Sequence, residues 1–256
     1  MKNQNIQNLA FYGNTMKQYD LILSLTTWTG RIDTTGLKYV LMSMLKQETK
    51  ANYKVVLVLS EDEFINKNIP SWLVELEGLV NNFEILWTKE NTRAYKKYFP
   101  TRRKYPEENI CALDDDSPLH SNFVETMVNL LEKFPDRYIL GINPSYINVT
   151  TINSPRYACA CYRPDSLYPN YDELWGRKYF KDHDDEFYKL LAVLNGSHYV
   201  PVNMRNYIDI DKFNQNVKLS TLGNTQYGNL GSMWVKCFNE NPELGRLFNK
   251  NKNIKN

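Results

Sequence analysis

Four short apolar segments, separated by segments of helical pattern, constrain most strongly what this chain can fold into. They are DLILSLTTW (20–28), YKVVLVLS (53–60), NFEILWT (82–88) and NICAL (109–113). Continuous apolar runs of this length are typical of strands that are buried on both faces of a sheet. Because helical patterns lie between them, the chain predicts right-handed β-α-β units and an α/β fold with a mostly parallel sheet flanked by helices.

The helices of this first half are predicted from their apolar spacing and their boundary residues. They are expected at 36–47, 71–79 and 92–99. In the first of them Leu37, Val40 and Met44 fall on one face, which predicts that this face packs against the sheet. Pro100 is expected to end the third helix, since proline cannot continue a helix.

The second half of the chain has a less regular pattern. We expect a helix at 122–134 with Ser121 as its N-cap, strands at 137–150 and 157–163, an aromatic, proline-containing loop at 164–176, a helix at 184–196 and a strand at 197–202. From about residue 203 the chain is polar and rich in asparagine, so we predict an extended or mobile segment there.

No internal repeat and no linker rich in proline or glycine divides the chain. Its 256 residues are enough for one large α/β domain. We therefore predict a single domain at 20–202, built from halves at 20–120 and 121–202, with an N-terminal extension at 1–19 and a polar C-terminal extension at 203–256.

Charge and composition exclude several classes of partner and location. The formal net charge is only +2, which argues against nucleic acid as a partner. Basic residues do cluster at 93–105, where they could face a phosphate, and at 249–256, where peripheral contact with a membrane stays open. No signal-peptide run or stretch of about 18 apolar residues is present, which predicts a cytoplasmic protein. The four cysteines lack zinc-type spacing and are expected to be reduced thiols.

The strongest chemical signal is Asp114-Asp115-Asp116, directly after the fourth apolar segment. Ligands of parallel α/β sheets gather beyond the carboxyl ends of the strands. An Asp-x-Asp at such an end can bind Mg²⁺ or Mn²⁺ and leave coordination positions for phosphate oxygens. A solvated acidic loop or an acidic helix start is the alternative explanation.

Five stretches together resemble a family of bacterial GT-A-type glycosyltransferases of capsule and surface-polysaccharide biosynthesis, including lipooligosaccharide. They are SLTTWTGRI (24–32), SMLKQ (43–47), VVLVLSEDEF (55–64), IPSWLVEL (69–76) and RAYKKYFPTRRKYPEENICALDDDSPLH (93–120). The later segments YRPDSLYP (162–169) and HDDEFYKLLAVLNG (183–196) also resemble that family, whereas RYACAC replaces the glycine-rich stretch that usually precedes YRPDSL.

The resemblance implies a GT-A (Rossmann-like) fold with a nucleotide-binding half at 20–120 and an acceptor half at 121–202. It implies a UDP-sugar as donor, a glycan acceptor, and Mn²⁺ or Mg²⁺ on the donor diphosphate. By motif match Asp116 is the main metal ligand, with Asp114 supporting the metal and facing the donor. The residues assigned to the nucleotide or its diphosphate are Thr26, Thr27, Arg31, Lys96, Lys97, Asp114 and Asp115.

Two further assignments concern the acceptor half. An inverting transferase, which we favour over a retaining one, needs a carboxylate to accept the proton of the acceptor hydroxyl, and Asp184 or Asp185 is expected to supply it. A helix N-terminus that favours acids is the structural alternative for this pair. His198 is a candidate third metal ligand, although a single histidine at a strand end is commonly structural.

Two other functions compete with glycosyl transfer. A phosphohydrolase of the haloacid-dehalogenase type also carries Asp-x-Asp after an apolar strand, but on the first strand of its domain, whereas three apolar segments precede it here. The missing glycine-rich stretch would instead suit a non-catalytic protein that binds nucleotides or glycans on a transferase scaffold. Release of UDP from UDP-sugars, hydrolysis of phosphate esters, or binding of UDP without release distinguishes the three.

Overall fold

The strands of this computed structural model, which describes residues 17–142, 157–208 and 230–252, form one sheet in the order β3-β2-β1-β4-β6-β5-β7. Their bounds are β1 (Leu21–Thr26), β2 (Tyr53–Ser60), β3 (Phe83–Thr88), β4 (Ile110–Leu113), β5 (Arg137–Ile142), β6 (Tyr157–Tyr162) and β7 (His198–Asn203). Strands β1 to β4 are mutually parallel, and β5 and β7 are parallel to each other. Only β6, among the strands described, runs antiparallel to its neighbours β4 and β5.

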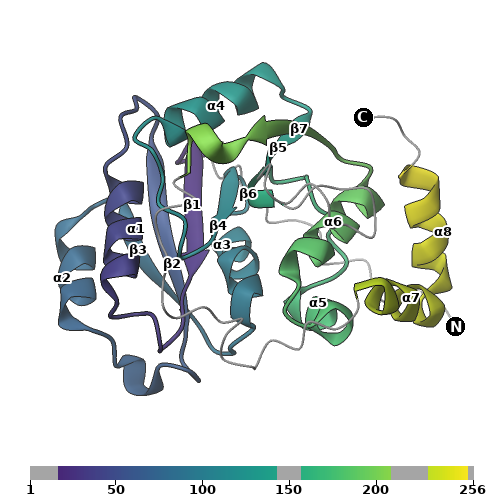
Figure 1. The fold of residues 1–256 in the computed structure, drawn as a ribbon, viewed down its shortest axis with the longest axis horizontal. Helices are drawn as coiled ribbons and strands as arrows, with labels where there is room; N and C mark the ends of the chain where they lie inside the picture. Colours follow the sequence, from purple (N-terminus) through teal and green to yellow (C-terminus); the bar gives the residue numbers. More distant parts are fainter. Residues whose placement is uncertain (1–16, 143–156, 209–229, 253–256) are drawn as a thin grey trace, which may run out of the picture.

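This arrangement confirms the predicted single α/β domain with a mostly parallel sheet flanked by helices (Figure 1). The carboxyl ends of β1, β2, β3 and β4 lie at one edge of the sheet, because these strands share one direction. The acid triplet follows β4, so the chain delivers it to the edge where the loops after the other parallel strands also gather.

Helices cover both faces of the sheet. Their bounds are α1 (Thr35–Leu45), η1 (Ile65–Lys67), α2 (Ser71–Leu79), η2 (Arg93–Lys97), α3 (Phe99–Lys104), α4 (Phe123–Lys133), α5 (Glu173–Phe180), α6 (Asp184–Asn195), η4 (Met204–Asn206), α7 (Leu230–Glu240) and α8 (Pro242–Asn251). The side chains of β1 alternate, with Leu21, Leu23 and Leu25 packed in the core under α1, α2 and α4. Ile22 points the other way, into the core shared with η2, α5 and α6.

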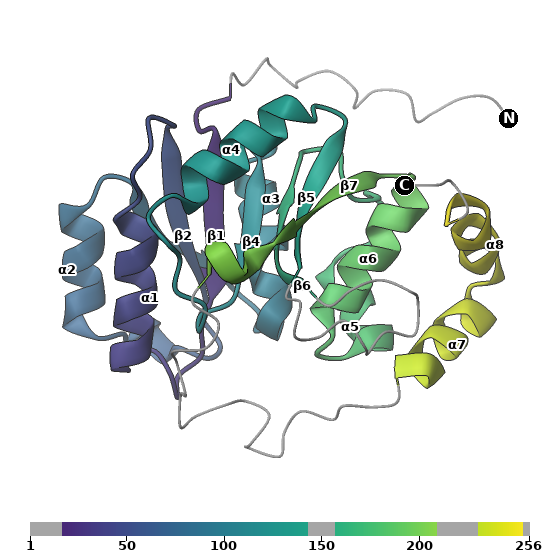
Figure 2. The same cartoon turned by 45° about the horizontal axis from the view of Figure 1, so that its top comes forward.

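Two helices, α7 and α8, lie within the segment that the sequence predicts to be extended or mobile. Each is amphipathic: α7 buries Trp234 and Cys237, and α8 buries Leu244 and Phe248. They lie beyond α5 and α6 at one end of the molecule (Figures 1 and 2). The polar, asparagine-rich composition of 203–256 as a whole conceals both helices. The parts of the two predicted extensions at 1–16, 209–229 and 253–256 lie outside the described residues.

The helix predicted at 92–99 is wrong at its end. Residues 93–97 form the 3-10 helix η2, and the α-helix α3 then begins at Phe99 and continues through Pro100. Proline is accepted in the first turn of a helix because its missing N–H would have no partner there. Pro100 therefore starts a helix where the sequence analysis expects it to end one.

Two other boundaries differ from the prediction, and a third cannot be compared along its whole length. The N-cap position of α4 is Asn122, which gives no side-chain cap, so Ser121 does not have the predicted capping role. Helix α5 begins inside the predicted aromatic loop, where the carboxylate of Asp172 accepts a hydrogen bond from the Trp175 N–H at 2.9 Å. Strand β5 is described from Arg137 to Ile142, and the rest of the strand predicted to residue 150 lies outside the described residues.

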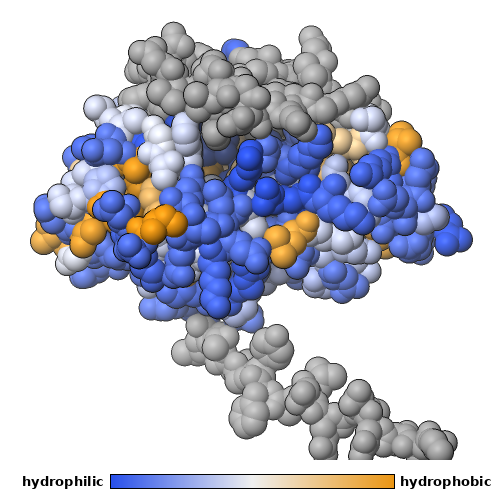
Figure 3. Space-filling model, turned by 90° about the horizontal axis from the view of Figure 1, so that it is seen from below, coloured by the Kyte–Doolittle hydropathy of each residue, from blue (hydrophilic) through white to orange (hydrophobic). Residues whose placement is uncertain are grey.

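The described residues can be compared with the predictions on membrane spans, cysteines and surface charge. No helix in the described ranges is long and apolar enough to cross a membrane. All four cysteines are buried free thiols. The face drawn in Figure 3 is mostly hydrophilic, with hydrophobic residues in a few separate places.

Candidate functional site

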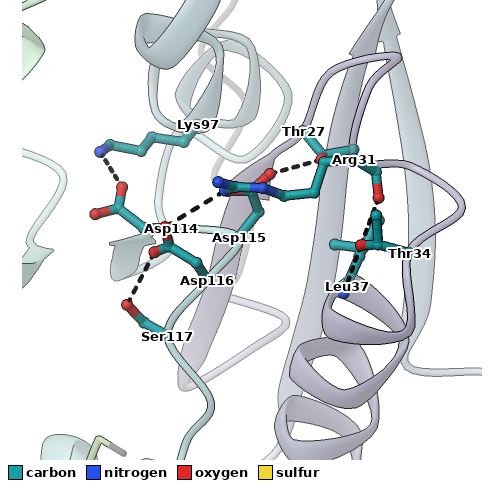
Figure 4. Close-up of polar contacts among 9 residues, drawn as sticks. All are labelled: Thr27, Arg31, Thr34, Leu37, Lys97, Asp114, Asp115, Asp116 and Ser117. Atoms are coloured by element: carbon teal, nitrogen blue, oxygen red, sulfur yellow. Dashed lines mark hydrogen bonds and ion pairs between the residues drawn. The ribbon is translucent and has the colours of Figure 1, made fainter. Parts of the chain in front are cut away.

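The three adjacent aspartates after β4 have different surroundings (Figure 4). Asp115 is 8% exposed and points into the protein. The side chains of Asp114 and Asp116 are 52% and 42% exposed. The Asp-x-Asp pair therefore faces solvent while the aspartate between the two is buried.

Arg31 is the internal partner of the buried aspartate. Its Nη1 donates to Asp115 Oδ1, and the hydroxyl of Thr27 donates to Asp115 Oδ2 at 2.6 Å. The same Nη1 lies 3.5 Å from Asp116 Oδ2. Thr27 and Arg31 belong to the loop after β1, and this strand pairs directly with β4, so neighbouring strands bring these groups together.

The start of α1 holds the backbone of Arg31 in place. The Thr34 hydroxyl donates to the carbonyl oxygen of Arg31 at 2.8 Å and accepts from the Leu37 N–H at 3.2 Å (Figure 4). Thr34 is thus the N-cap of α1 and also an anchor for the loop that presents Arg31.

Lys97 is the second cation of the site. Its Nζ lies 2.9 Å from Asp114 Oδ1 and 2.9 Å from Asp184 Oδ2, and its side chain is 7% exposed. Asp184 is itself 5% exposed, in the first turn of α6. The lysine joins the loop after β4 to a helix that begins almost seventy residues later in the chain.

A cluster of aromatic rings brings α6 to this position. The Tyr95 ring of η2 lies 5.8 Å from that of Phe187 and 6.2 Å from that of Tyr188, and both of these residues belong to α6. Phe99 stacks on Phe187 at 6.0 Å. Helix α5 passes close to these rings at Gly176, where a Cβ atom would lie 2.5 Å from a Phe187 ring carbon and 2.8 Å from one of Tyr95.

The described site contains more negative than positive charge. Arg31 and Lys97 face the carboxylates of Asp114, Asp115, Asp116, Asp184 and Asp185. Burial lowers the pKa of Lys97, but the charges of these acids outweigh that effect and raise the pKa well above its ordinary value. Lys97 is therefore a permanent cation in this environment.

Burial, together with the excess of negative charge, raises the pKa values of several of these carboxyl groups. Burial, opposed by Arg31, raises the pKa of Asp115 to about 6. Burial and then the charge of Asp114 raise the pKa of Asp116. Burial and then the charge of Asp184 raise the pKa of Asp185 to about 7. An additional cation bound here would relieve this repulsion.

Lys96 and Thr26, also predicted at the site, have partners around β2. The ammonium of Lys96 donates to the Ser60 hydroxyl and lies 3.1 Å from Glu63 Oε2, and burial lowers its pKa despite that carboxylate. The Thr26 hydroxyl donates to the carbonyl oxygen of Val58 at 2.8 Å. Both residues lie at the same edge of the sheet as the acids but on its β2 side.

Glu63 is a residue that the sequence analysis missed. It accepts from the Thr29 N–H at 3.3 Å and from the Asn91 amide at 2.8 Å, so it joins the loops after β1, β2 and β3. The signal was present in SEDEF (60–64), because acids after the second apolar segment must reach the same edge as the triplet.

His198 lies at the opposite end of the strands from the acids, away from the carboxyl ends of β1 to β4. It pairs with Arg137 at the start of β5, and the register through Cys161 places that level near Asn109, before β4 begins. Asp114 is five residues further along, about 16 Å in the strand direction. The register corrects the expectation that His198 completes a metal shell with Asp114 and Asp116.

The described residues contain no group of three or more histidine, cysteine, aspartate or glutamate side chains that could hold a metal ion alone. Asp114 and Asp116 nevertheless fit a divalent cation, because their partly exposed oxygen donors stand in a region of excess negative charge. Mg²⁺ and Mn²⁺ commonly bind through one or two carboxylates and take their remaining ligands from water and phosphate.

Most of the other basic side chains of the cluster at 93–105 bind groups of the protein. Arg102 donates to the carbonyl oxygens of Tyr105, Pro106 and Glu108 after the end of α3. Arg103 makes a bidentate pair with Glu173 of α5. Only Lys97 of this cluster, within the described part of the chain, has an ion pair with the acid triplet.

Comparison with solved structures finds the same fold in a larger protein. The chain is similar to residues 1–349 of the S. aureus glycosyltransferase TarS, with a TM-score of 0.51 and 14% identity over 73% of this chain. A second structure of TarS, in complex with UDP-GlcNAc, matches with the same score and identity. The chain spans 59% and 57% of the lengths of these two structures. No protein-family model and no curated protein sequence matches the chain.

Proposed function

We propose that this protein is a metal-dependent glycosyltransferase that moves a sugar from a UDP-sugar to a hydroxyl of a bacterial surface glycan, with inversion at the anomeric carbon. The observation that carries the proposal is the partly exposed pair Asp114 and Asp116 at the carboxyl end of β4. The fold shared with TarS, which binds UDP-GlcNAc in one structure, supports it.

The charges of the site support a donor that carries a diphosphate. Asp114 and Asp116 would hold Mn²⁺ or Mg²⁺, and when bound this ion supplies positive charge for the departing nucleoside diphosphate. Thr26 at the end of β1, Arg31 in the loop after β1 and Lys96 in η2 lie at the carboxyl ends of the parallel strands and would contact the nucleotide.

The acid pair at the start of α6 supports a reaction with an acceptor hydroxyl. Inverting transfer needs a carboxylate that takes a proton as the hydroxyl oxygen attacks the anomeric carbon. The raised pKa of Asp185, about 7, lies close to neutral pH, where a carboxylate is both available and basic enough for this task.

The test is release of UDP from a panel of UDP-sugars, with Mn²⁺ and bacterial oligosaccharide acceptors. We expect turnover by the wild-type protein and a loss of at least about 100-fold in Asp116→Ala, because an electrostatic contact to the leaving group is removed. Asp136→Ala is the matched control, since the Asp136 side chain is 75% exposed near the start of β5.

Two outcomes would replace the proposal. Hydrolysis of phosphate esters without use of any UDP-sugar would indicate a phosphohydrolase. Binding of UDP in calorimetry without release from any donor would indicate a non-catalytic nucleotide-binding protein.

A further inference from the structure

Lys97 occupies an unusual position for a lysine that would simply bind a phosphate. Its ammonium stands between two carboxylates from distant parts of the chain, Asp114 and Asp184, at 2.9 Å from each. With a side chain only 7% exposed, it is a buried counter-ion that ties the loop after β4 to the start of α6. A buried charge is stable only when such partners compensate it.

The two aspartates at the start of α6 differ in how they meet this lysine. Asp184 is 5% exposed and paired with Lys97. Asp185 is partly exposed and is influenced by the charges of Asp184, Lys97, Asp114 and Lys189. A base must reach a hydroxyl that arrives from solvent, and of these two residues Asp185 is the more exposed.

We propose that Lys97 is a positioning residue that fixes Asp114 and Asp184, and that the more exposed Asp185 is the base of the transfer reaction. The assignment of the base rests on the proposed function. In that step the acceptor oxygen bonds to the anomeric carbon and its proton passes to Asp185. The bond between the anomeric carbon and the diphosphate oxygen breaks, and its electron pair leaves with the UDP.

The charges that face Asp185 define a test that needs no substrate. They come from η2 (Lys97), from the loop after β4 (Asp114) and from α6 itself (Asp184 and Lys189). Lys97 is a cation brought to this group from outside α6, so removing its charge strengthens the net repulsion among the acids. Asp185 must then hold its proton to a higher pH.

The experiment is a ¹³C NMR titration of the aspartate carboxyl groups, in which Asp185 is identified by the signal missing in Asp185→Asn. We expect Lys97→Met to raise the midpoint of Asp185 by at least about one pH unit, and Lys97→Arg to restore it to within a few tenths. Lys104→Met is the matched control, because Lys104 pairs with Glu84 on the surface, and it should leave the midpoint unchanged. An unchanged midpoint in Lys97→Met overturns the positioning role.

Enzyme assays test the division of roles between the two aspartates. Asp185→Asn should lower kcat at least about 1,000-fold with little change in the KM for the donor, whereas Asp184→Asn should lower it less. In Lys97→Met the acid limb of the kcat profile should move to higher pH together with the NMR midpoint. The assignment of Asp185 is overturned if Asp185→Asn keeps its kcat while Asp184→Asn loses it.

Two further outcomes separate this inference from the proposed function. If the wild-type protein uses no sugar donor, the proposed function fails and the base assignment fails with it, but the NMR result still decides whether Lys97 positions the carboxylates. If Lys97→Met does not fold, the double variant Lys97→Met/Asp184→Asn should restore folding, because it removes the unpaired charge with its partner. Failure of the double variant to fold would overturn the counter-ion role.

Discussion

Arg31 and Lys97 each bridge two carboxylates, but the two cations reach them through different parts of the fold. Arg31 leaves the loop after β1 and meets Asp115 and Asp116 after the neighbouring strand β4. Lys97 leaves η2 and meets Asp114 on one side and Asp184 of α6 on the other. The first bridge closes within the parallel half of the sheet, whereas the second joins the two halves of the domain.

The difference in burial indicates a difference in role. Arg31 and Asp115 have side chains that are 3% and 10% exposed, so their pair is internal and mainly structural. Asp114, on the Lys97 side, is 52% exposed and accessible to a ligand. We infer that the Arg31 bridge fixes the position of the acid triplet, while the Lys97 bridge connects the triplet to the acid pair at the start of α6.

Replacing Arg31 should have the largest effect on stability. In Arg31→Met the buried Asp115 carboxylate loses its counter-ion, and such an uncompensated charge costs about 3–5 kcal/mol. Urea unfolding at pH 8, above the wild-type pKa of Asp115 of about 6, measures the loss. Adding Asp115→Asn should recover most of it.

The exposed pair of Lys38 and Asp33 provides the control for Arg31. Its side chains are 44% and 66% exposed, so Lys38→Met should cost less than about 1 kcal/mol. A loss in Arg31→Met no larger than in Lys38→Met would contradict the view that the Arg31 bridge is a buried structural pair.

A change at Gly176 should break the second bridge without touching a charge. A Cβ atom there would lie 2.5 Å from a ring carbon of Phe187, so Gly176→Ala must displace the aromatic cluster that holds α6 against η2. We expect a loss of about 2–3 kcal/mol from overpacking, together with reduced donor turnover. Urea unfolding and assays of UDP release measure these two losses.

Gly78 offers a matched control for this substitution. It also lies in a helix, α2, but a Cβ atom there has no neighbour within 4 Å. Gly78→Ala should therefore stabilise the protein by up to about 1 kcal/mol through helix propensity. If both alanine variants behave alike, the close approach at Gly176 does not control the position of α6.

The titration of Asp185 allows the excess negative charge around Lys97 to be measured as a pH dependence of folding stability. Its pKa is raised to about 7 in the folded protein, so the folded state binds this proton more tightly than the unfolded state. The wild-type protein should therefore lose stability as the pH rises from about 4 to about 7. Asp185→Asn removes this contribution and should be more stable than the wild type by about 1–2 kcal/mol at pH 8.

Urea unfolding at pH 4 and pH 8 checks this expectation. The two proteins should differ little at pH 4, where Asp185 is protonated in the folded state. Asp136→Asn, at a side chain that is 75% exposed, should follow the wild type at both values. An Asp185→Asn variant that is less stable than the wild type at pH 8 would show that the carboxylate is stabilised where it lies.

The two bridges also show how far the sequence could predict this molecule. The parallel order of β1 to β4 follows from apolar runs and helical spacing, and it places Arg31 next to the acids because β1 and β4 are neighbours. The split of the triplet into a buried Asp115 and two exposed acids depends on where the Arg31 guanidinium lies, which no local pattern specifies. The spacing of the apolar runs therefore predicted that these residues gather at the carboxyl ends of the strands, but not which side chains pair with one another.

The bridge made by Lys97 was harder to predict from the sequence. Asp184 and Asp185 were recognised at a helix start, yet their pairing with Lys97 depends on aromatic contacts between η2 and α6. The prediction for His198 was wrong for a related reason. Strand β7 is parallel to β5, so its first residue lies at the end of the strands that is away from the acids. A strand's direction in the sheet is set by tertiary pairing, which the residues of that strand alone do not determine.

The smallest expected effect comes from Thr34 and tests whether the first bridge has its own support. Thr34 caps α1 and holds the carbonyl group of Arg31, so Thr34→Ala should cost about 1 kcal/mol in urea unfolding. Thr34→Ser keeps the hydroxyl and should recover most of the loss. If the anchor acts through Arg31, the cost of Thr34→Ala should shrink in an Arg31→Met/Asp115→Asn background, because the loop no longer has a charge to present. An undiminished cost there would mean that Thr34 supports only the helix.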